Sequence, residues 1–235
     1  MSYSDQLLAR RRGEVSLHLG YWPGETDRDL ARAQAALDQR VLDEADLKDG
    51  QVVVDVGCGL GGTLLAASQR GRFTLHGVNL DERQLQVARE VVEATWHHCC
   101  ATALPFADAS VDALLCVEAA FHFPSREGFV AEARRVLRPG GRFVATDLVT
   151  VDAPPSEEPV IQAGIGPWPD FLEPTDWSTL WPGCSITDLS AQTLPSYRCF
   201  LGPTPGQDPM SRAVATLGRL HAAGQVRVLL VSARR

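Results

Sequence analysis

The chain has 235 residues, of which 45% are hydrophobic and 22% are charged, and its formal net charge is −7 at pH 7. This composition is typical of a globular protein, and the acidic balance argues against a nucleic acid partner, whose phosphates are neutralised by clustered Lys and Arg. Because no stretch approaches the roughly 20 apolar residues of a membrane helix, we expect no membrane partner either.

The N-terminal residues and the cysteines indicate the cell compartment. Residues 1–13 are mostly polar, which predicts that no signal peptide opens the chain. The cysteines are scattered and show no extracellular context, at Cys58, Cys99, Cys100, Cys116, Cys184 and Cys199. Such a pattern favours free thiols in a reducing cytoplasm over a disulfide framework.

Two kinds of segment alternate between residues 46 and 150. Apolar, often β-branched runs predict five strands, at 51–56, 73–79, 96–100, 111–117 and 142–149. Helical spacing of apolar residues predicts the helices between them, at 61–70, 81–94 and 126–137, the last stopped by Pro139-Gly140-Gly141. This order predicts an α/β fold with a Rossmann-like, seven-stranded, mostly parallel sheet and helices on both faces.

The flanking segments have a different character. The first 45 residues are expected to be mainly helical, and residues 152–183, rich in Pro, Gly and Trp, to form an irregular insert after the fifth strand. A strand at 185–191, a helix at 210–222 and a strand at 225–233 complete the prediction.

A glycine-rich turn follows the first predicted strand, with the sequence Asp55-Val56-Gly57-Cys58-Gly59-Leu60-Gly61-Gly62. Glycines allow backbone dihedral angles that other residues rarely adopt, and they let a ligand approach the main chain closely. The amides at the start of the next helix would face an anionic or polar group of that ligand. The glycines at 57, 59 and 62 also fit the spacing of a dinucleotide-binding turn.

Asp55 discriminates between the possible ligands. A carboxylate beside the turn would repel the pyrophosphate of a dinucleotide, whereas it suits the ammonium and sulfonium groups of S-adenosylmethionine (SAM). The acid expected about 20 residues onward to bind the ribose of NAD is also missing, because Asn79 stands at the end of the second strand. We therefore favour SAM over NAD; a tight turn that binds nothing is the remaining alternative.

The turn resembles motif I of the class I SAM-dependent methyltransferases. The segment from Gly77 to Gln84 resembles one found in a subset of them, which includes rebeccamycin-type sugar O-methyltransferases and tocopherol-type C-methyltransferases. Other segments continue the match in order over nearly the whole chain, at 18–22, 104–106, 117–122, 135–141 and 188–190. The resemblance implies SAM as cofactor, S-adenosylhomocysteine as product, and a single domain 1–235 with a helical lid at 1–45, a SAM-binding half at 46–150 and a cap insert with the last strands at 151–235.

The resemblance also implies a set of cofactor-binding residues. The glycine turn would hold the methionine part, Asn79 and Leu80 the ribose and adenine, and Gln84 the ribose. Cys100 stands where many relatives have an Asp that receives the adenine amino group, and because a thiol is a poor acceptor, adenine would rely on the backbone near Ala101. The expected set is Tyr21 from the lid, Asp55, Gly57, Cys58, Gly59, Gly61, Asn79, Leu80, Gln84, Cys100, Ala101 and Glu118.

Two residues are candidates for the chemical step. Methyl transfer to a hydroxyl requires positioning of the acceptor and removal of its proton. His122 follows the fourth strand at its carboxyl end, where ligands bind in such sheets, and histidine can act as a base near neutral pH. The resemblance places His122 and Asp147 on the active-site histidine and aspartate of the sugar O-methyltransferases. We expect His122 to deprotonate the acceptor and Asp147 to orient His122 or the acceptor; alternatively, His122 only packs between Phe121 and Phe123, and Glu118 is a second candidate.

Two further patterns leave the function open in part. In His97-His98-Cys99-Cys100, neighbouring side chains on a strand point to opposite faces, so too few could share a zinc ion and we predict no metal. The aromatic residues of the insert could line an apolar acceptor pocket or form the insert's own core: Trp168, Phe171, Trp177 and Trp181.

The predicted function is SAM-dependent methylation of a hydroxyl group on a small, natural-product-like acceptor of secondary metabolism. Two alternatives remain, namely C- or N-methylation of a similar molecule and a protein that binds SAM without transferring the methyl group. The sequence predicts a monomer or a homodimer.

Overall fold

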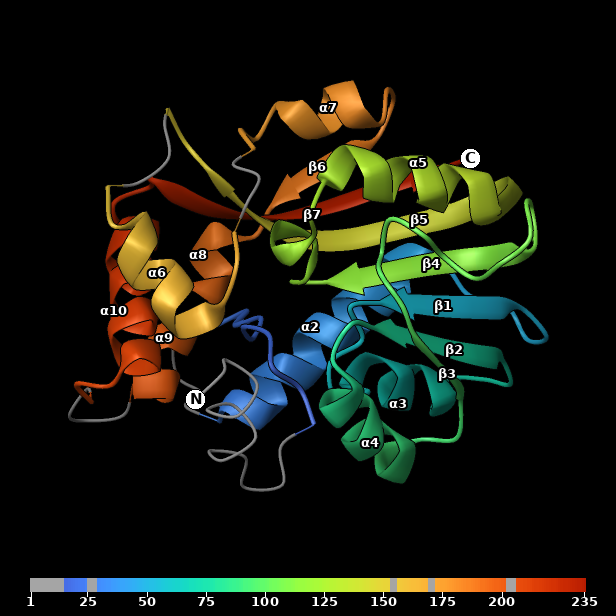
Figure 1. The fold of residues 1–235 in the computed structure, drawn as a ribbon, viewed down its shortest axis with the longest axis horizontal. Coiled ribbons are helices and arrows are strands. Elements are labelled where there is room, and N and C mark those ends of the chain that lie inside the picture. The colour runs from blue at the N-terminus through green and yellow to red at the C-terminus, as the bar shows by residue number, and fades with distance from the viewer. Residues whose placement is uncertain (1–14, 25–28, 153–155, 169–171, 202–205) are drawn as a thin grey trace.

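The computed structural model describes residues 15–24, 29–152, 156–168, 172–201 and 206–235. Seven strands form one sheet in the order β3-β2-β1-β4-β5-β7-β6 (Figure 1). β7 runs antiparallel to both of its neighbours, whereas the other pairs are parallel. The strands are β1 (Val52–Val56), β2 (Thr74–Asn79), β3 (Thr95–His98), β4 (Val111–Val117), β5 (Leu137–Thr150), β6 (Ser185–Asp188) and β7 (Val226–Arg234). The predicted mostly parallel, seven-stranded sheet is confirmed.

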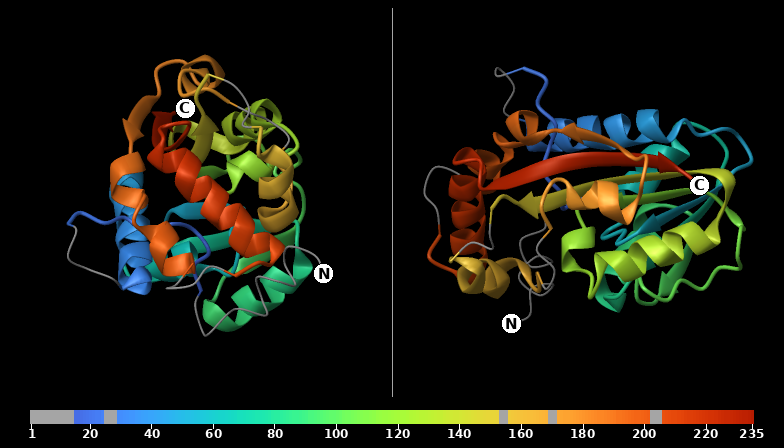
Figure 2. Two further views of the ribbon diagram at one scale, coloured as in Figure 1. Left: turned by 90° about the vertical axis from the view of Figure 1, so that its left-hand side faces the viewer. Right: turned by 90° about the horizontal axis from the view of Figure 1, so that it is seen from above.

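Helices cover both faces of the sheet, and Figure 2 shows α2 and α5 on opposite sides of it. The reason is visible in β1, where Val53 packs into the apolar cluster on the α2 side and Val54 into the cluster on the α5 side, because successive strand residues face opposite ways. The helical segments are α2 (Leu30–Ala45), α3 (Gly62–Ser68), α4 (Glu82–Val91), the 3₁₀ turn η1 (Ala120–His122), α5 (Arg126–Val136), α6 (Glu158–Ile165), α7 (Asp176–Leu180), α8 (Ser190–Thr193), α9 (Ser196–Leu201) and α10 (Pro209–Ala222).

β5 begins earlier than predicted. The sequence placed Leu137 in the preceding helix and began the strand at Arg142, but Leu137 pairs with Val111 and the strand continues through Pro139-Gly140-Gly141. The register shifts opposite Val111, and Gly140 adopts a φ of 79°. Proline is tolerated in a strand at such an irregularity, because the missing N–H group would pair with nothing there.

The segment after β5 is more regular than predicted. It contains α6 and α7, of which α6 packs against α10. The strand predicted at 185–191 ends at Asp188, because α8 starts two residues later. In Figure 1 the helices α6, α8, α9 and α10 lie together beyond the carboxyl ends of the parallel strands. They form a cap over the end of the sheet where the site is expected.

The described part of the N-terminal segment differs from the predicted helical lid. Only α2 is helical there, while residues 15–24 form no helix. Two backbone hydrogen bonds hold this irregular segment: Tyr21 N–H donates to the Ala33 carbonyl, and Trp22 N–H donates to the Gln192 carbonyl. Within the described ranges, no helix is both long and apolar enough to cross a membrane.

Candidate active site

A large cavity opens at the carboxyl end of the parallel strands. Its volume is about 1420 Å³, whereas pockets for one drug-sized ligand typically measure roughly 300–1,000 Å³. Its walls come from residues 15–19, the turn after β1, the end of β2, residues 98–101, the end of β4 with η1, and the cap helices. The cavity therefore has room for two molecules side by side, at the position where ligands bind in open α/β sheets.

Most of the predicted cofactor residues line this cavity. They are Asp55, Gly57, Cys58, Gly59, Asn79, Leu80, Gln84, Cys100, Ala101 and Glu118. Gly57 adopts a φ of 78°, and a Cβ atom there would lie 2.3 Å from the Cβ atom of Ala119. Only glycine fits at this position, because a side chain would be strained and would collide with a backbone-fixed neighbour. Gly61 does not line the cavity: with a φ of 88° it is the N-cap residue of α3, packed against Trp96.

Asp55 is a buried carboxylate at the start of the turn. Its side chain is 2% exposed, and no hydrogen-bond partner for its Oδ1 atom exists among the described residues. Burial raises its pKa to about 7, with a further contribution from the charge of Asp38, whereas His18 acts in the opposite direction. An unpaired buried carboxylate oxygen is unfavourable unless a donor or a cation satisfies it. The ammonium group of SAM would do so, and this position therefore fits that cofactor.

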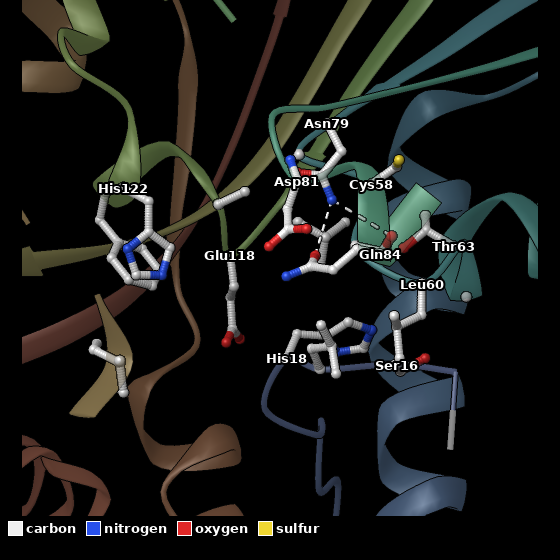
Figure 3. Close-up of a pocket in the computed structure, with 18 of the residues that line it drawn as sticks. Ser16, His18, Cys58, Leu60, Thr63, Asn79, Asp81, Gln84, Glu118 and His122 are labelled. Carbon is white, nitrogen blue, oxygen red and sulfur yellow. Dashed lines mark hydrogen bonds between the residues drawn. The ribbon is translucent and has the colours of Figure 1, made fainter. Parts of the chain in front are cut away.

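Glu118 is a second buried carboxylate, at the end of β4. One oxygen, Oε2, accepts the N–H of Leu19 at 2.9 Å, while Oε1 has no hydrogen-bond partner within the described ranges. Burial raises the pKa of Glu118 to about 7, and its backbone φ of 47° lies in the left-handed region. Figure 3 shows its side chain between His122 on one side and Asn79 and Gln84 on the other. Glu118 thus stands at the boundary between two halves of the cavity.

The polar residues after β2 form a small hydrogen-bonded group. The Asn79 amide donates to Gln84 Oε1 at 2.9 Å and to the Gly59 carbonyl at 3.5 Å (Figure 3). Leu80, also predicted for this site, is 65% exposed. The Cys100 thiol lies 3.2 Å from Thr102 Oγ1. The arrangement places amide groups and the apolar side chain of Leu80 along one wall, which suits a ribose and an adenine ring.

Residues 16–19, which the sequence did not single out for binding, form another wall of the cavity. His18 is 8% exposed, and its Nε2 atom lies 3.3 Å from Asp38 Oδ1. Its Nδ1 atom lies 2.7 Å from the Leu19 carbonyl oxygen. The Leu19 carbonyl oxygen can only accept, so Nδ1 carries a proton, and the nearby Asp38 carboxylate favours a second proton on Nε2, which makes the imidazolium form the favoured one. Burial alone would lower its pKa, but Asp38, Glu118 and the Leu19 carbonyl outweigh this effect and raise it to about 9.

Neighbouring helices hold this segment in place. The Gln34 side chain donates to the carbonyl oxygens of Ser16 and His18, and Thr63 Oγ1 donates to Asp38 at 2.7 Å. The only sequence signal for this arrangement was the family-like segment 18–22, from which Tyr21 was predicted instead of His18.

His122 lines the cavity at the end of η1. Its Nδ1 atom lies 2.6 Å from the Pro167 carbonyl oxygen, so Nδ1 carries the proton and Nε2 carries the lone pair. Burial lowers its pKa to about 4; the Pro167 carbonyl acts against this effect, and the charge of Arg126 adds to it. The ring also packs on Phe121, with 4.0 Å between ring centroids. The imidazole is therefore neutral at physiological pH, in the form that can accept a proton.

Two more predicted site residues, besides Gly61, lie outside the cavity. The side chain of Tyr21 packs against the apolar core, because the backbone of this segment is bonded to Ala33 and not turned toward the cofactor end. Asp147 is fully buried and paired with Arg126, with 2.7 Å between Oδ2 and Nε. Its neighbour Leu148 lines the cavity instead, since alternate strand residues face opposite sides of the sheet. The expected orienting role of Asp147 toward His122 or the acceptor does not fit this position.

The aromatic residues of the insert belong to the core. Trp177 and Trp181 pack on Phe143 on the α5 side of the sheet, and Trp168 packs on Phe121 with its side chain almost fully buried. None of the three lines the cavity, so of the two readings of the sequence the structure supports the core. Phe171 lies outside the described residues.

Within the His-Cys segment, His97 and His98 belong to β3, and their side chains point to opposite faces of the sheet, as expected for a strand. His97 Nε2 lies 3.1 Å from His76 Nδ1, whereas His98 bonds to the Leu80 carbonyl on the cavity side. In the portion of the chain that the structure describes, no three His, Cys, Asp or Glu side chains are grouped so that they could hold a metal ion.

Comparison with known proteins shows that the chain is similar to methyltransferases. Residues 54–145 match the family model of a methyltransferase domain. The methyltransferase GfsG of Streptomyces halstedii is 28% identical, over 98% of this chain and 92% of its own length. The (+)-O-methylkolavelool synthase of Herpetosiphon aurantiacus is 32% identical over 76% of this chain, and the 27-O-demethylrifamycin SV methyltransferase of Amycolatopsis mediterranei 31% over 63%; the chain spans only 62% and 56% of these two relatives.

Solved structures share the fold. The [4+2]-cyclase SpnF superimposes with a TM-score of 0.80 at 20% identity, covering 99% of this chain and 91% of that one. The geranyl diphosphate C-methyltransferase of Streptomyces coelicolor, solved with S-adenosyl-L-homocysteine, superimposes with a TM-score of 0.79 at 19% identity, covering 94% and 88%. Together the matches confirm the predicted fold class, the resemblance to class I methyltransferases and the predicted cofactor.

Proposed function

We propose that this chain, a class I SAM-dependent methyltransferase that acts on small molecules, transfers the methyl group to a hydroxyl oxygen of its acceptor. The observation that carries the proposal is the place of His122, a neutral imidazole in the wall of a cavity large enough for cofactor and acceptor together. Several relatives whose names include O-methyltransferase or an O-methylated product support the choice of oxygen.

The cofactor supplies an activated methyl group, and the residues of the chain bind and orient both partners. Asp55 and the glycine turn would hold the amino acid part, Asn79 and Gln84 the ribose, and Cys100 with Ala101 the adenine. Residues 15–19 would close over this end, held by the bonds to Gln34 and Asp38. In an in-line displacement most of the rate enhancement comes from such positioning.

His122 would remove the proton of the acceptor hydroxyl. Its Nδ1–H bond to Pro167 fixes the tautomer and the orientation of the ring, and its Nε2 lone pair is the acceptor for the proton. Glu118, whose carboxylate lies between His122 and the cofactor residues, would contact the cofactor from the opposite side to Asn79 (Figure 3). We expect Asp147 to act only through the core, by pairing with Arg126.

The overall organisation of the proposed enzyme is a single domain with a cofactor-binding half and a cap. None of the six cysteines, all of which lie within the described ranges, forms a disulfide, which supports placement in the reducing cytoplasm. The acidic net charge of −7 supports a small-molecule acceptor over nucleic acid.

The decisive experiment is transfer of the labelled methyl group. Purified protein is incubated with tritiated SAM and an extract of small metabolites, and the extracted products are heated with hydriodic acid, which releases methyl iodide from methyl ethers and esters. We expect label in a product whose methyl group behaves as an ether or ester. Label in an acid-stable C–CH₃ group would show C-methylation instead. Binding of S-adenosylhomocysteine with no transfer to any acceptor would show a SAM-binding protein without this activity.

A further inference from the structure

Charged side chains are distributed unevenly along the walls of the cavity. We call the lining residues up to Glu118 the cofactor half and those from Ala119 onward the acceptor half. The cofactor half contains several charged side chains, at His18, Asp55, Asp81, Glu82, Arg83 and Glu118. Among the described lining residues of the acceptor half, none is an Asp, Glu, Lys or Arg. The two halves therefore offer very different environments to a ligand.

The acceptor half is mainly apolar. Side chains from β5, α6, α9 and α10 contribute Leu148, Ile165, Phe200, Met210, Val214 and Leu217. They come from the end of β5 and from three cap helices, so this surface is formed by the tertiary packing of the cap against the sheet. Apolar walls bind ligands by removing apolar surface from water.

The few polar side chains of the acceptor half add no charge. The Tyr197 hydroxyl lies 3.4 Å from His221 Nδ1, and Ser211 Oγ donates to Asp208 at 2.7 Å. His122 is neutral, because burial lowers its pKa. These groups can donate or accept single hydrogen bonds to an acceptor hydroxyl or carbonyl, but they cannot neutralise an anion.

The guanidinium group of Arg126, which follows η1 in the chain, cannot pair with an anionic acceptor either. Arg126 is fully buried and does not line the cavity, and its donors go to Asp147 and to the Leu148 carbonyl. An anionic acceptor would thus give up its water without gaining a cation from the described walls of the acceptor half, which is strongly unfavourable. Glu118 at the boundary would repel it further.

We infer that the acceptor is an uncharged, bulky and predominantly apolar alcohol, and that the cavity excludes molecules with a carboxylate or a phosphate group. The inference rests on the proposed function and adds the chemical class of its substrate. According to this inference, the acceptor half selects the substrate in two ways. Its apolar side chains favour an apolar acceptor, and the lack of charged side chains among its described lining residues disfavours an anion.

The test compares three probes with one carbon skeleton. Geraniol, geranic acid and geranyl diphosphate are titrated calorimetrically at pH 8 into protein saturated with S-adenosylhomocysteine, and the larger alcohol farnesol is included as a size control. We expect a neutral alcohol to bind with a negative heat-capacity change, as burial of apolar surface requires, and both anions to bind at least tenfold more weakly. Equal or tighter binding of an anion, or no binding of either alcohol, would overturn the inference.

A charge introduced into the acceptor half should reverse the preference. Met210 lies in the first turn of α10 and is only partly buried, so Met210→Arg should fold. We expect this variant to bind geranic acid at least tenfold more tightly than the parent protein does and to lose affinity for geraniol. The control Val160→Arg, which adds the same charge at an exposed residue that does not line the cavity, should keep the original order. Unchanged preferences in Met210→Arg would contradict the assignment of this wall to the acceptor.

The experiments distinguish failure of the proposed methyl transfer from failure of the inferred substrate class. If an alcohol binds but label from SAM enters no acceptor, the proposed function fails while the binding preference stands. If label enters only anionic acceptors, the enzyme activity stands and the inferred substrate class is wrong. Affinity for S-adenosylhomocysteine, measured in the same titrations, shows in either case whether the cofactor half is intact.

Discussion

His18 and Asp38 form a buried ion pair, with 3.3 Å between Nε2 and Oδ1 and with both side chains less than a tenth exposed. The pair connects the irregular segment that lines the cavity to α2. Because Thr63 Oγ1 donates to the same carboxylate oxygen, Asp38 also connects α2 to the helix that follows the glycine turn. One carboxylate thus joins three elements around the cofactor half.

This pair predicts a dependence of stability on alkaline pH. The pKa of His18 is raised to about 9 from 6.5, so its stabilising contribution is complete below pH 6.5 and is lost as the pH rises through 9. We expect the wild-type protein to lose roughly 3 kcal/mol of unfolding free energy between pH 6.5 and 9 from this group, and His18→Gln to lose much less. Urea unfolding at pH 6.5 and pH 9 measures the free energy of unfolding. Lys48→Met, which removes an exposed ion pair, is the control variant. Equal pH dependence in wild type and His18→Gln would contradict the prediction.

Asp55 predicts a dependence of cofactor affinity on pH. Its pKa of about 7, raised by burial, means that the carboxylate is largely protonated at pH 6 and ionised at pH 8. An ammonium group binds the ionised form, so affinity for S-adenosylhomocysteine should rise about tenfold from pH 6 to 8, with release of a proton. Asp55→Asn should bind more weakly at pH 8 and show a flatter profile. Calorimetry in two buffers of different ionisation enthalpy measures both the affinity and the number of protons released. If the affinity of Asp55→Asn rose equally steeply with pH, another group would be responsible for the pH dependence.

His122 predicts a loss of turnover without loss of cofactor binding. Removing a general base typically lowers the rate roughly 10²- to 10⁴-fold, and we expect a fall in kcat of this size for His122→Ala, with unchanged affinity for S-adenosylhomocysteine. Because the pKa of His122 is lowered to about 4, the wild-type kcat should show no acid limb from this group between pH 5.5 and 8. His76→Gln, on a residue that does not line the cavity, is the matched control. Near-normal kcat in His122→Ala would leave the ring with a packing role only.

The buried pair of Arg126 and Asp147 predicts a large effect on stability. Asp147→Ala would leave the guanidinium of Arg126 without its carboxylate and would also remove the acceptor of Trp177 Nε1–H. Breaking a buried pair in this way costs roughly 3–5 kcal/mol, which a shift of the urea midpoint would show. Arg72→Met, at a pair whose side chains are mostly exposed, should change stability by less than about 0.5 kcal/mol. The double variant Arg126→Met/Asp147→Ala should be more stable than Asp147→Ala alone; the opposite order would refute this explanation.

The sequence predicted the parts of the site that lie within one turn of a strand end. The glycines after β1 and the pair of Asn79 and Gln84 are local, and their spacing alone indicates where their side chains and backbone meet. The order of strands and helices along residues 46–150 was predictable for the same reason, because each element has its own apolar period.

The contacts that the sequence did not predict connect distant segments. Asp38 meets Thr63 across 25 positions and His18 across 20, and nothing in the local pattern of α2 distinguishes this acid from a solvated one. The acceptor half is likewise assembled in part from α6 and α9, two short helices that the sequence did not predict. Such contacts depend on how helices pack against one another, which local spacing does not encode.

Asp147 illustrates how a correct element can give a wrong side-chain position. The strand was predicted near its observed place, but a shift of one residue moves a side chain to the other face of the sheet. Leu148 faces the cavity and Asp147 faces α5. The family resemblance carried the residue type to this position, whereas only the structure shows which way it points.

The left-handed backbone conformation of Glu118 affects the stability of the protein. A residue with a side chain in this conformation typically destabilises the fold by roughly 1–3 kcal/mol, and here the same residue buries a carboxylate oxygen that finds no partner within the described ranges. Glycine would relax the backbone and remove the unpaired oxygen, but it would also leave the Leu19 N–H without its acceptor and remove a negative charge beside His18. This side chain therefore ties the stability of the turn after β4 to the position of residues 18 and 19.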